Sequence, residues 1–186
     1  SAPRRAGRSG PPLSLEGLVV VARWRRPCCR AQVTRAPLYP PDATLHDHAP
    51  ECREITASLY GGDRERRVRQ ELLLGIGGLR ALDAVSVAPT VFHMNEGHSA
   101  FLGLERIRTL MHDDGLPFAA AIEQVAGSTV FTTHTPVPAG NETFDVALVR
   151  RYLEPVATDL GLTWDAFVDM GQAPGQDESL FGMTPL

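Results

Sequence analysis

The chain has 186 residues, 43% of them hydrophobic, and a formal net charge of −4. This length and composition predict one globular domain with a real core, and the acidic balance argues against a nucleic-acid partner. No apolar run approaches the roughly 20 residues that cross a membrane, so we expect no membrane partner; the three cysteines form no Cys-x-x-Cys pair, which favours reduced thiols and a cytoplasmic setting.

The first part of the chain divides into a basic arm and a short β region. Arg, Gly, Pro and Ser dominate the opening residues, which predicts an unstructured segment. Residues 18–24 and 32–39 are each predicted to form a strand. Pro40 ends the second strand, because proline cannot continue a central ladder.

A long helix is predicted from Asp63, a good N-cap, to about Leu82. Residues 75–78, with the sequence Gly-Ile-Gly-Gly, lie inside this helical pattern and do not follow a strand. They therefore indicate close packing against another helix rather than a nucleotide-binding loop. The predicted buried stripe of the helix consists of Val68, Leu72, Ile76 and Leu79.

Residues 90–94 form a short apolar run with β-branched and aromatic character, which predicts a buried strand. Helical spacing starts at about Gly97, so Asn95, Glu96 and His98 are predicted at a strand end beside the free N–H groups of a helix N-terminus. Open α/β sheets bind ligands in that position. The alternative is that Asn95 only caps the helix and His98 bonds a neighbouring loop.

A second strand with polar residues at its end follows. Apolar spacing predicts a helix over residues 118–127 and a buried strand over residues 128–133, and His134 and Thr135 come directly afterwards. This order of elements favours parallel pairing through a right-handed crossover. The two strand ends then lie side by side, and the predicted fold class is α/β, a Rossmann-like parallel sheet with flanking helices, incomplete in this chain.

The last part of the chain is predicted to be helical and then irregular. Asp145 caps one helix, and Thr163 begins a shorter one. We expect part of the apolar stripe of the first helix to lack neighbours, so that the isolated chain aggregates. Residues 171–186 are predicted to be a loop without a closing element. The stripe consists of Val149, Tyr152, Leu153, Val156 and Leu160.

The polar strand ends have side chains that bear on three kinds of chemistry. A zinc site from His93, His98, His134 and Glu96 has the correct ligand types, but neither helical nor strand spacing groups them. A nucleophilic triad lacks a serine or cysteine on a sharp strand–helix turn. Neutral His, Asn and Glu side chains beside helix N–H groups suit sugar hydroxyls, which favours a sugar-binding site.

Three motifs carry a family resemblance. They are YGGDRERRVRQELLLGIGG at residues 60–78, VFHMNEGHSAF at 91–101 and FTTHTPVPAGN at 131–141. Their sequence, order and spacing closely resemble the bacterial α-glucan phosphorylases, of the glycogen, starch and maltodextrin phosphorylase family. The resemblance covers residues 32–186 and implies a partial N-terminal, glucan-side domain of a two-domain glycosyltransferase fold. Residues 1–31 match poorly and are expected to be a disordered or divergent arm.

The resemblance implies an activity and a cofactor. The family transfers a glucosyl unit from an α-1,4-glucan to inorganic phosphate, giving glucose 1-phosphate, and uses pyridoxal phosphate. The lysine that holds this cofactor lies in the family's C-terminal domain, and this chain contains no lysine, since all 18 basic residues are arginine. We therefore expect a fragment that is inactive alone. A non-catalytic carbohydrate-binding or interaction module is the alternative, and homo-oligomerisation of the intact enzyme is left open.

The resemblance also implies a substrate site, with no catalytic, cofactor-binding or metal-binding residue assigned in this chain. At the position of His98, the family's histidine hydrogen-bonds the 6-hydroxyl of the reacting glucose. Its backbone carbonyl faces the anomeric region, where positive charge develops. The implied substrate-binding residues are Asn95, Glu96, Gly97, His98, His134 and Thr135.

Overall fold

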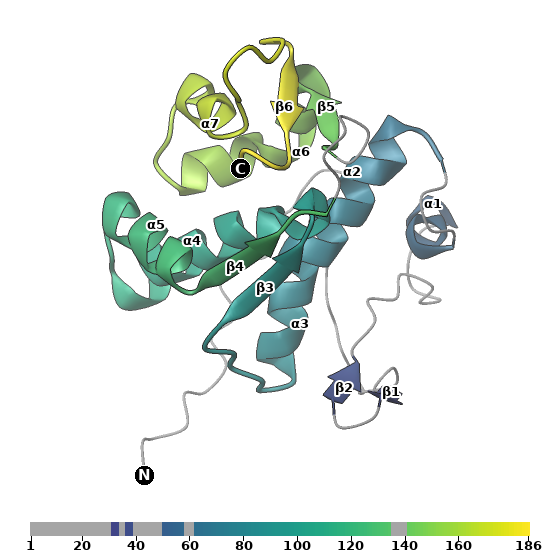
Figure 1. Ribbon diagram of the computed structural model, residues 1–186, viewed down its shortest axis with the longest axis vertical. Coiled ribbons are helices and arrows are strands. Elements are labelled where there is room, and N and C mark those ends of the chain that lie inside the picture. Colours follow the sequence, from purple (N-terminus) through teal and green to yellow (C-terminus); the bar gives the residue numbers. More distant parts are fainter. Residues whose placement is uncertain (1–30, 34–35, 39–49, 58–61, 135–140) are drawn as a thin grey trace.

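The computed structural model describes residues 31–33, 36–38, 50–57, 62–134 and 141–186 (Figure 1). The strands are β1 (Ala31–Val33), β2 (Ala36–Leu38), β3 (Phe92–Asn95), β4 (Thr129–Thr132), β5 (Thr143–Asp145) and β6 (Leu180–Gly182). The α-helices are α1 (Pro50–Arg53), α2 (Arg64–Leu72), α3 (Gly78–Ala84), α4 (Phe101–Asp114), α5 (Phe118–Gly127), α6 (Val146–Asp159) and α7 (Trp164–Met170). The strand predicted at residues 18–24 and the predicted site residue Thr135 lie outside the described residues.

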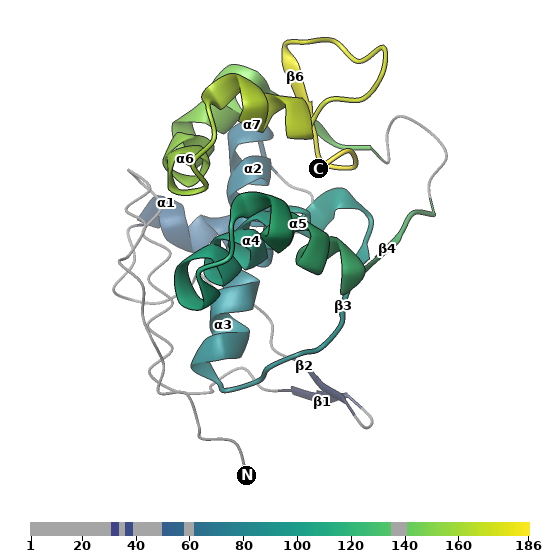
Figure 2. The same cartoon turned by 90° about the vertical axis from the view of Figure 1, so that its left-hand side faces the viewer.

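Strands β3 and β4 form a parallel pair, as predicted, with Phe92 opposite Thr129 and Asn95 opposite Thr132. Helices α4 and α5, which connect the two strands, lie together on one side of this small sheet (Figures 1 and 2). The fold is therefore α/β, with a small parallel sheet and flanking helices. That architecture is compatible with part of a Rossmann-like domain.

The prediction that both parallel strands are buried is wrong. Val91 beside β3 is 58% exposed, and Val130 and Phe131 in β4 are 48% and 38% exposed. Within the described ranges, β3 and β4 pair only with each other, and the two connecting helices lie on one side of them. An apolar run in the sequence does not distinguish a strand covered on both faces from one covered on a single face.

The predicted long helix is present as a nearly continuous rod formed by α2, a π-helical segment η2 (Leu73–Gly77) and α3. The side chain of Asp63 accepts a 2.8 Å hydrogen bond from the backbone N of Arg66, which confirms the N-cap. In the predicted stripe, Val68, Leu72 and Ile76 are buried and Leu79 is half-buried.

Close packing explains Gly75, as predicted. A Cβ atom at this position would lie 2.7 Å from the backbone N of Leu102 and 3.0 Å from Phe101. The π-helical segment therefore approaches the first turn of α4 at backbone distance. This contact connects the long helix to the element that follows β3.

The C-terminal region contains a sheet that the sequence did not predict. Strand β6 pairs antiparallel with β5, with Phe181 opposite Phe144, so the expectation that residues 171–186 contain no closing element is wrong. The other residues of this range form turns and loops, as predicted. Phe181 and Met183 are fully buried. These residues supply neighbours to α6, and the expectation that its stripe lacks partners is wrong as well. All five residues of that stripe are buried: Val149, Tyr152, Leu153, Val156 and Leu160.

The helix caps predicted in this region are confirmed. Asp145 accepts a hydrogen bond from the backbone N of Ala147 at 2.8 Å, and Thr163 accepts one from Ala166 at 3.2 Å. The strand predicted over residues 32–39 is instead two three-residue strands, β1 and β2, which pair antiparallel. No described helix is long and apolar enough to span a membrane.

Candidate functional site

The site is centred on Glu96, the residue directly after β3. Its backbone has φ +60° and ψ −177°, a conformation that side-chain-bearing residues rarely adopt and that costs about 1–3 kcal/mol. The backbone N of Glu96 donates a 2.8 Å hydrogen bond to the carbonyl of Thr132, which extends the pairing of β3 with β4. This conformation turns the chain directly from the strand into the short 3-10 turn η3 (Gly97–Ser99).

The Glu96 side chain joins the ends of the two strands. It is only 8% exposed. One carboxylate oxygen accepts a 2.6 Å hydrogen bond from the backbone N of His134, and the other accepts a 3.1 Å bond from the hydroxyl of Thr133. Hydrogen bonds to a charged acceptor are worth about 1.5–3 kcal/mol, enough to offset the backbone strain.

Polar side chains of the two strands also pair with each other. Nε2 of His134 lies 2.7 Å from Oδ1 of Asn95, and Nε2 of His93 lies 2.7 Å from the hydroxyl of Thr132. The structure therefore brings together Asn95, Glu96 and His134, as the parallel pairing predicts.

His98 and Gly97 contact other parts of the molecule. Nδ1 of His98 lies 3.6 Å from a carboxylate oxygen of Glu71 and 3.7 Å from one of Glu142, so its ring faces the long helix and the β5 region. A Cβ atom at Gly97 would lie 2.9 Å from Met183, which explains the glycine by packing against the chain after β6.

Sequence reasoning missed a group of charged residues beneath His98. Arg67 donates from Nη2 to Glu71 at 3.0 Å and from Nε to Glu142 at 3.1 Å. The sequence did contain a signal for Glu71, because this charged residue directly precedes Leu72 of the predicted buried stripe of the helix. No spacing in the sequence connects it to Glu142.

The two carboxyl groups have opposite environments. Burial raises the pKa of Glu71 to about 10, with further contributions from the hydrogen bond with Glu142 and from its charge. Burial also acts to raise the pKa of Glu142, but hydrogen bonds from Arg67 and Glu71 outweigh it and hold that pKa below its usual value. The pair therefore favours one protonated and one ionised carboxyl group.

The residues whose atoms are spaced like metal ligands differ from those of the zinc site considered from the sequence. Among the described residues, the group with metal-ligand spacing is Glu71, His98 and Glu142, whose ligand atoms lie within 4.8 Å of one another. The guanidinium of Arg67 already bonds both carboxyl groups. A cation therefore sits between the candidate ligands, and the arrangement is that of an ion-pair network.

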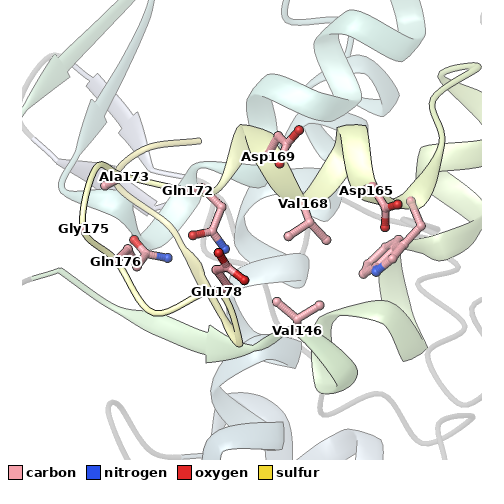
Figure 3. Close-up of a pocket in the computed structure, with 10 residues that line it drawn as sticks. Val146, Asp165, Val168, Asp169, Gln172, Ala173, Gly175, Gln176 and Glu178 are labelled. Carbon is pink, nitrogen blue, oxygen red and sulfur yellow. The ribbon is translucent and has the colours of Figure 1, made fainter.

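A hollow separate from these residues lies in the C-terminal region, between α7 and the segment that precedes β6 (Figure 3). Trp164, Asp165, Asp169, Gln176 and Glu178 are among its lining residues. It contains none of the predicted site residues.

Comparison with known proteins gives the family. No family model matches the chain. It is 47% identical over 152 residues to a glycogen phosphorylase of Mycobacterium tuberculosis, covering 76% of this chain and 18% of that protein. It is 40% identical over 172 residues to a maltodextrin phosphorylase of Thermococcus litoralis, covering 92% of this chain and 19% of the relative.

A glycogen phosphorylase of Aquifex aeolicus is 30% identical over 152 residues, which cover 82% of this chain and 22% of that protein. The chain thus spans about a fifth of the length of these relatives. The family seen in the sequence motifs is confirmed: over most of its length, this chain is homologous to one segment of the glycogen and maltodextrin phosphorylases.

Proposed function

We propose that this chain forms part of an α-glucan phosphorylase and contributes to its sugar pocket. The reaction transfers a glucosyl unit from the end of an α-1,4-glucan to inorganic phosphate and gives glucose 1-phosphate. The observation that carries the proposal is the joining of Asn95, Glu96 and His134 at two parallel strand ends, with His98 in the next turn.

The residues have separate roles in this proposal. Glu96 fixes the two strand ends, since its carboxylate is already used by Thr133 and His134. Asn95, His98 and His134 offer hydrogen-bonding groups that suit sugar hydroxyls without requiring a charged ligand. Gly97 allows the turn to pack closely. Thr135 follows the second strand in the sequence.

Pyridoxal phosphate, which the resemblance implies, does not fit the residues of this chain. The chain has no lysine to hold it. In this proposal the cofactor is bound by segments that the relatives have in addition to this one. When bound, it supplies acid–base chemistry through its phosphate group. The part of this chain is to bind and orient the sugar.

Removing His98 tests the proposal. In the protein that contains this chain, His98→Ala should lower kcat/KM for phosphorolysis of maltodextrin by about 10- to 150-fold, the effect of losing a hydrogen bond to a charged or strained transition state. His112→Ala is the matched control, because His112 is an exposed histidine of α4 that pairs with Asp159. Wild-type kinetics in the His98 variant would remove this residue from the site.

A non-catalytic carbohydrate-binding module is the second candidate, since the polar side chains at the strand ends suit sugar hydroxyls and none of them is assigned a catalytic role. Measuring phosphate-dependent release of glucose 1-phosphate separates the two functions. A protein that binds maltodextrin but releases no glucose 1-phosphate, even with added pyridoxal phosphate, would support the binding module.

A further inference from the structure

Two buried glutamates of this protein have contrasting charged neighbours. Glu105 in α4 is 2% exposed and accepts hydrogen bonds from two guanidinium groups, those of Arg80 and Arg108, at 2.7–3.1 Å. Glu71 in α2 is 1% exposed, and its hydrogen bond from Arg67 comes from a guanidinium that also binds Glu142. Glu105 has two cations close to it, whereas Glu71 shares one.

The charges around Glu71 do not balance if both carboxyl groups are ionised. Arg67 supplies one positive charge, and Glu71 and Glu142 would supply two negative charges. Arg64 lies 3.9 Å from Glu142, but its side chain is 69% exposed, so solvent screens it. The remaining titratable neighbour is His98. One bound proton therefore balances the group. Glu142 accepts hydrogen bonds from both Nε and Nη2 of Arg67, which favours its ionised form, so the proton resides on either Glu71 or His98.

Burial decides between these two residues. The side chain of His98 is 32% exposed as a whole, although its Nδ1, which faces the two carboxyl groups, is buried; the side chain of Glu71 is only 2% exposed. Oε2 of Glu71 has no hydrogen-bond partner within the described residues. An ionised carboxylate there would leave a buried charged oxygen unsolvated, which is more costly than burying a neutral acid. The proton therefore belongs on Glu71.

We propose that Glu71 is a positioning residue that stays a neutral carboxylic acid in the folded protein, so that Arg67 balances Glu142 and His98 remains an uncharged imidazole. A neutral imidazole can donate a hydrogen bond from one nitrogen and accept one at the other, as a sugar hydroxyl requires. Only this use of His98 rests on the proposed function. The protonation of Glu71 does not depend on it.

Infrared spectroscopy of the 186-residue chain tests the protonation state directly. At pH 7, the difference spectrum between wild type and Glu71→Gln should contain the carbonyl stretch of a protonated carboxyl group. The matched control is Glu105→Gln, whose difference spectrum should contain only ionised carboxylate bands. Nitrogen NMR of the wild-type His98 ring should give the neutral imidazole. Loss of an ionised carboxylate in Glu71→Gln, together with an imidazolium at His98, would overturn the proposal.

The pH dependence of stability gives a second test. Unfolded Glu71 loses its proton near its ordinary pKa of 4.5, whereas folded Glu71 keeps it to about pH 10. The unfolded state therefore binds fewer protons in this window, and Glu71 lowers stability progressively as pH rises. Glu71→Gln should remove that decline and raise the melting midpoint at pH 8, whereas Glu142→Gln should lower it.

Neither measurement uses substrate, so the two proposals can be tested separately. The protonation of Glu71 can be refuted while the phosphorylase function stands, and the phosphorylase function can be refuted while the protonation of Glu71 stands. If Glu71→Gln does not fold, the wild-type chain still decides the question. Its protonated carboxyl band should persist from pH 6 to pH 8 with a neutral His98 ring. Disappearance of the band in that range, or a charged ring at pH 8, would refute the proposal.

Discussion

Glu96 combines a backbone conformation that favours glycine with a side chain that holds two strand ends together. Comparing two substitutions separates these effects. Glu96→Ala loses both hydrogen bonds and keeps the strain, so we expect it to lower the free energy of unfolding by about 2–4 kcal/mol. Glu96→Gly loses the same bonds but adopts the positive φ freely, and it should be about 1 kcal/mol more stable than the alanine variant.

Urea unfolding of both variants measures this difference. Glycine is ordinarily the more destabilising of the two residues, because it has more backbone freedom to lose on folding. An alanine variant that is equally or more stable would show that the backbone at Glu96 carries no strain. Equal stability of wild type and Glu96→Ala would show that the carboxylate does not hold the strands.

The contribution of Glu105 to stability should depend on pH in the opposite direction to that of Glu71. Burial acts to raise its pKa, but hydrogen bonds from Arg108 and Arg80 outweigh burial and hold the pKa below its ordinary value of 4.5. Its stabilising contribution is therefore complete above about pH 4.5 and disappears as pH falls through the lowered folded pKa. Glu105→Gln should cost about 3–5 kcal/mol at pH 7, because it leaves two partly buried cations without their buried negative partner.

The measurement is the free energy of unfolding of Glu105→Gln as a function of pH. The cost should shrink in acid, where wild-type Glu105 also becomes protonated. Glu154→Gln is the control, because Glu154 forms an exposed pair with Arg150 on α6 and should change stability by no more than about 0.5 kcal/mol. A cost for Glu105→Gln that is the same at pH 3 and pH 7 would contradict this account.

At the level of elements, the contact between the long helix and α4 depends on Gly75. Gly75→Ala would bring a methyl group within 2.7 Å of the backbone N of Leu102, and backbone atoms cannot move aside cheaply. We expect a loss of about 1–3 kcal/mol, typical of overpacking. Gly78→Ala, three residues later, meets no atom within 4 Å and should instead gain up to about 1 kcal/mol from helix propensity.

Thermal or urea unfolding measures the change in stability of the two alanine variants. If this description of the contact is correct, Gly75→Ala is less stable than wild type and Gly78→Ala is more stable. Each substitution adds the same methyl group to the same helical rod, so their difference isolates the close approach to α4. Gly75→Ala with wild-type stability would show that η2 and α4 can separate without cost.

Helices were predictable from this sequence because their signals are local. The apolar period and the capping residues Asp63, Asp145 and Thr163 gave the helices with small errors in their bounds. The π-helical turn was not foreseen, because it depends on the contact between Gly75 and α4. Strands β5 and β6 have three residues each, too few for a periodic pattern. Their pairing depends on residues far apart in the sequence.

The candidate site was also predictable only in part, where its contacts follow from the pairing of neighbouring strands. Parallel pairing places the residues after β3 beside those after β4, so the sequence predicted that the two polar strand ends meet, and the structure joins them through Asn95 and His134. The surroundings of His98 were not predictable, because Glu71 and Glu142 come from separate segments that meet only through packing. Sugar binding by these residues stays a prediction until it is measured.

At the scale of the whole molecule, the described residues form a well-packed core and leave apolar side chains exposed at the small parallel sheet. The described C-terminal elements bury their stripes, whereas Val91 and Val130 at the small parallel sheet are about half exposed. Strand edges with unpaired backbone groups and apolar side chains pair readily with another chain. The sheet, rather than helix α6, is therefore where we expect the isolated chain to associate.

Replacing valines on this face by threonine tests that expectation. Threonine keeps the branched shape and the strand preference of valine but replaces an exposed methyl group by a hydroxyl, so Val91→Thr/Val130→Thr should weaken self-association without unfolding the sheet. Sedimentation velocity over a range of protein concentrations should show a wild-type chain that associates and a variant shifted toward monomer. Leu74→Gln is the control, because Leu74 is similarly exposed, at 43%, but lies on the long helix. If Leu74→Gln reduces association as much as the double variant, or if the wild type is monomeric at every concentration, the sheet face is not the surface through which the chain associates.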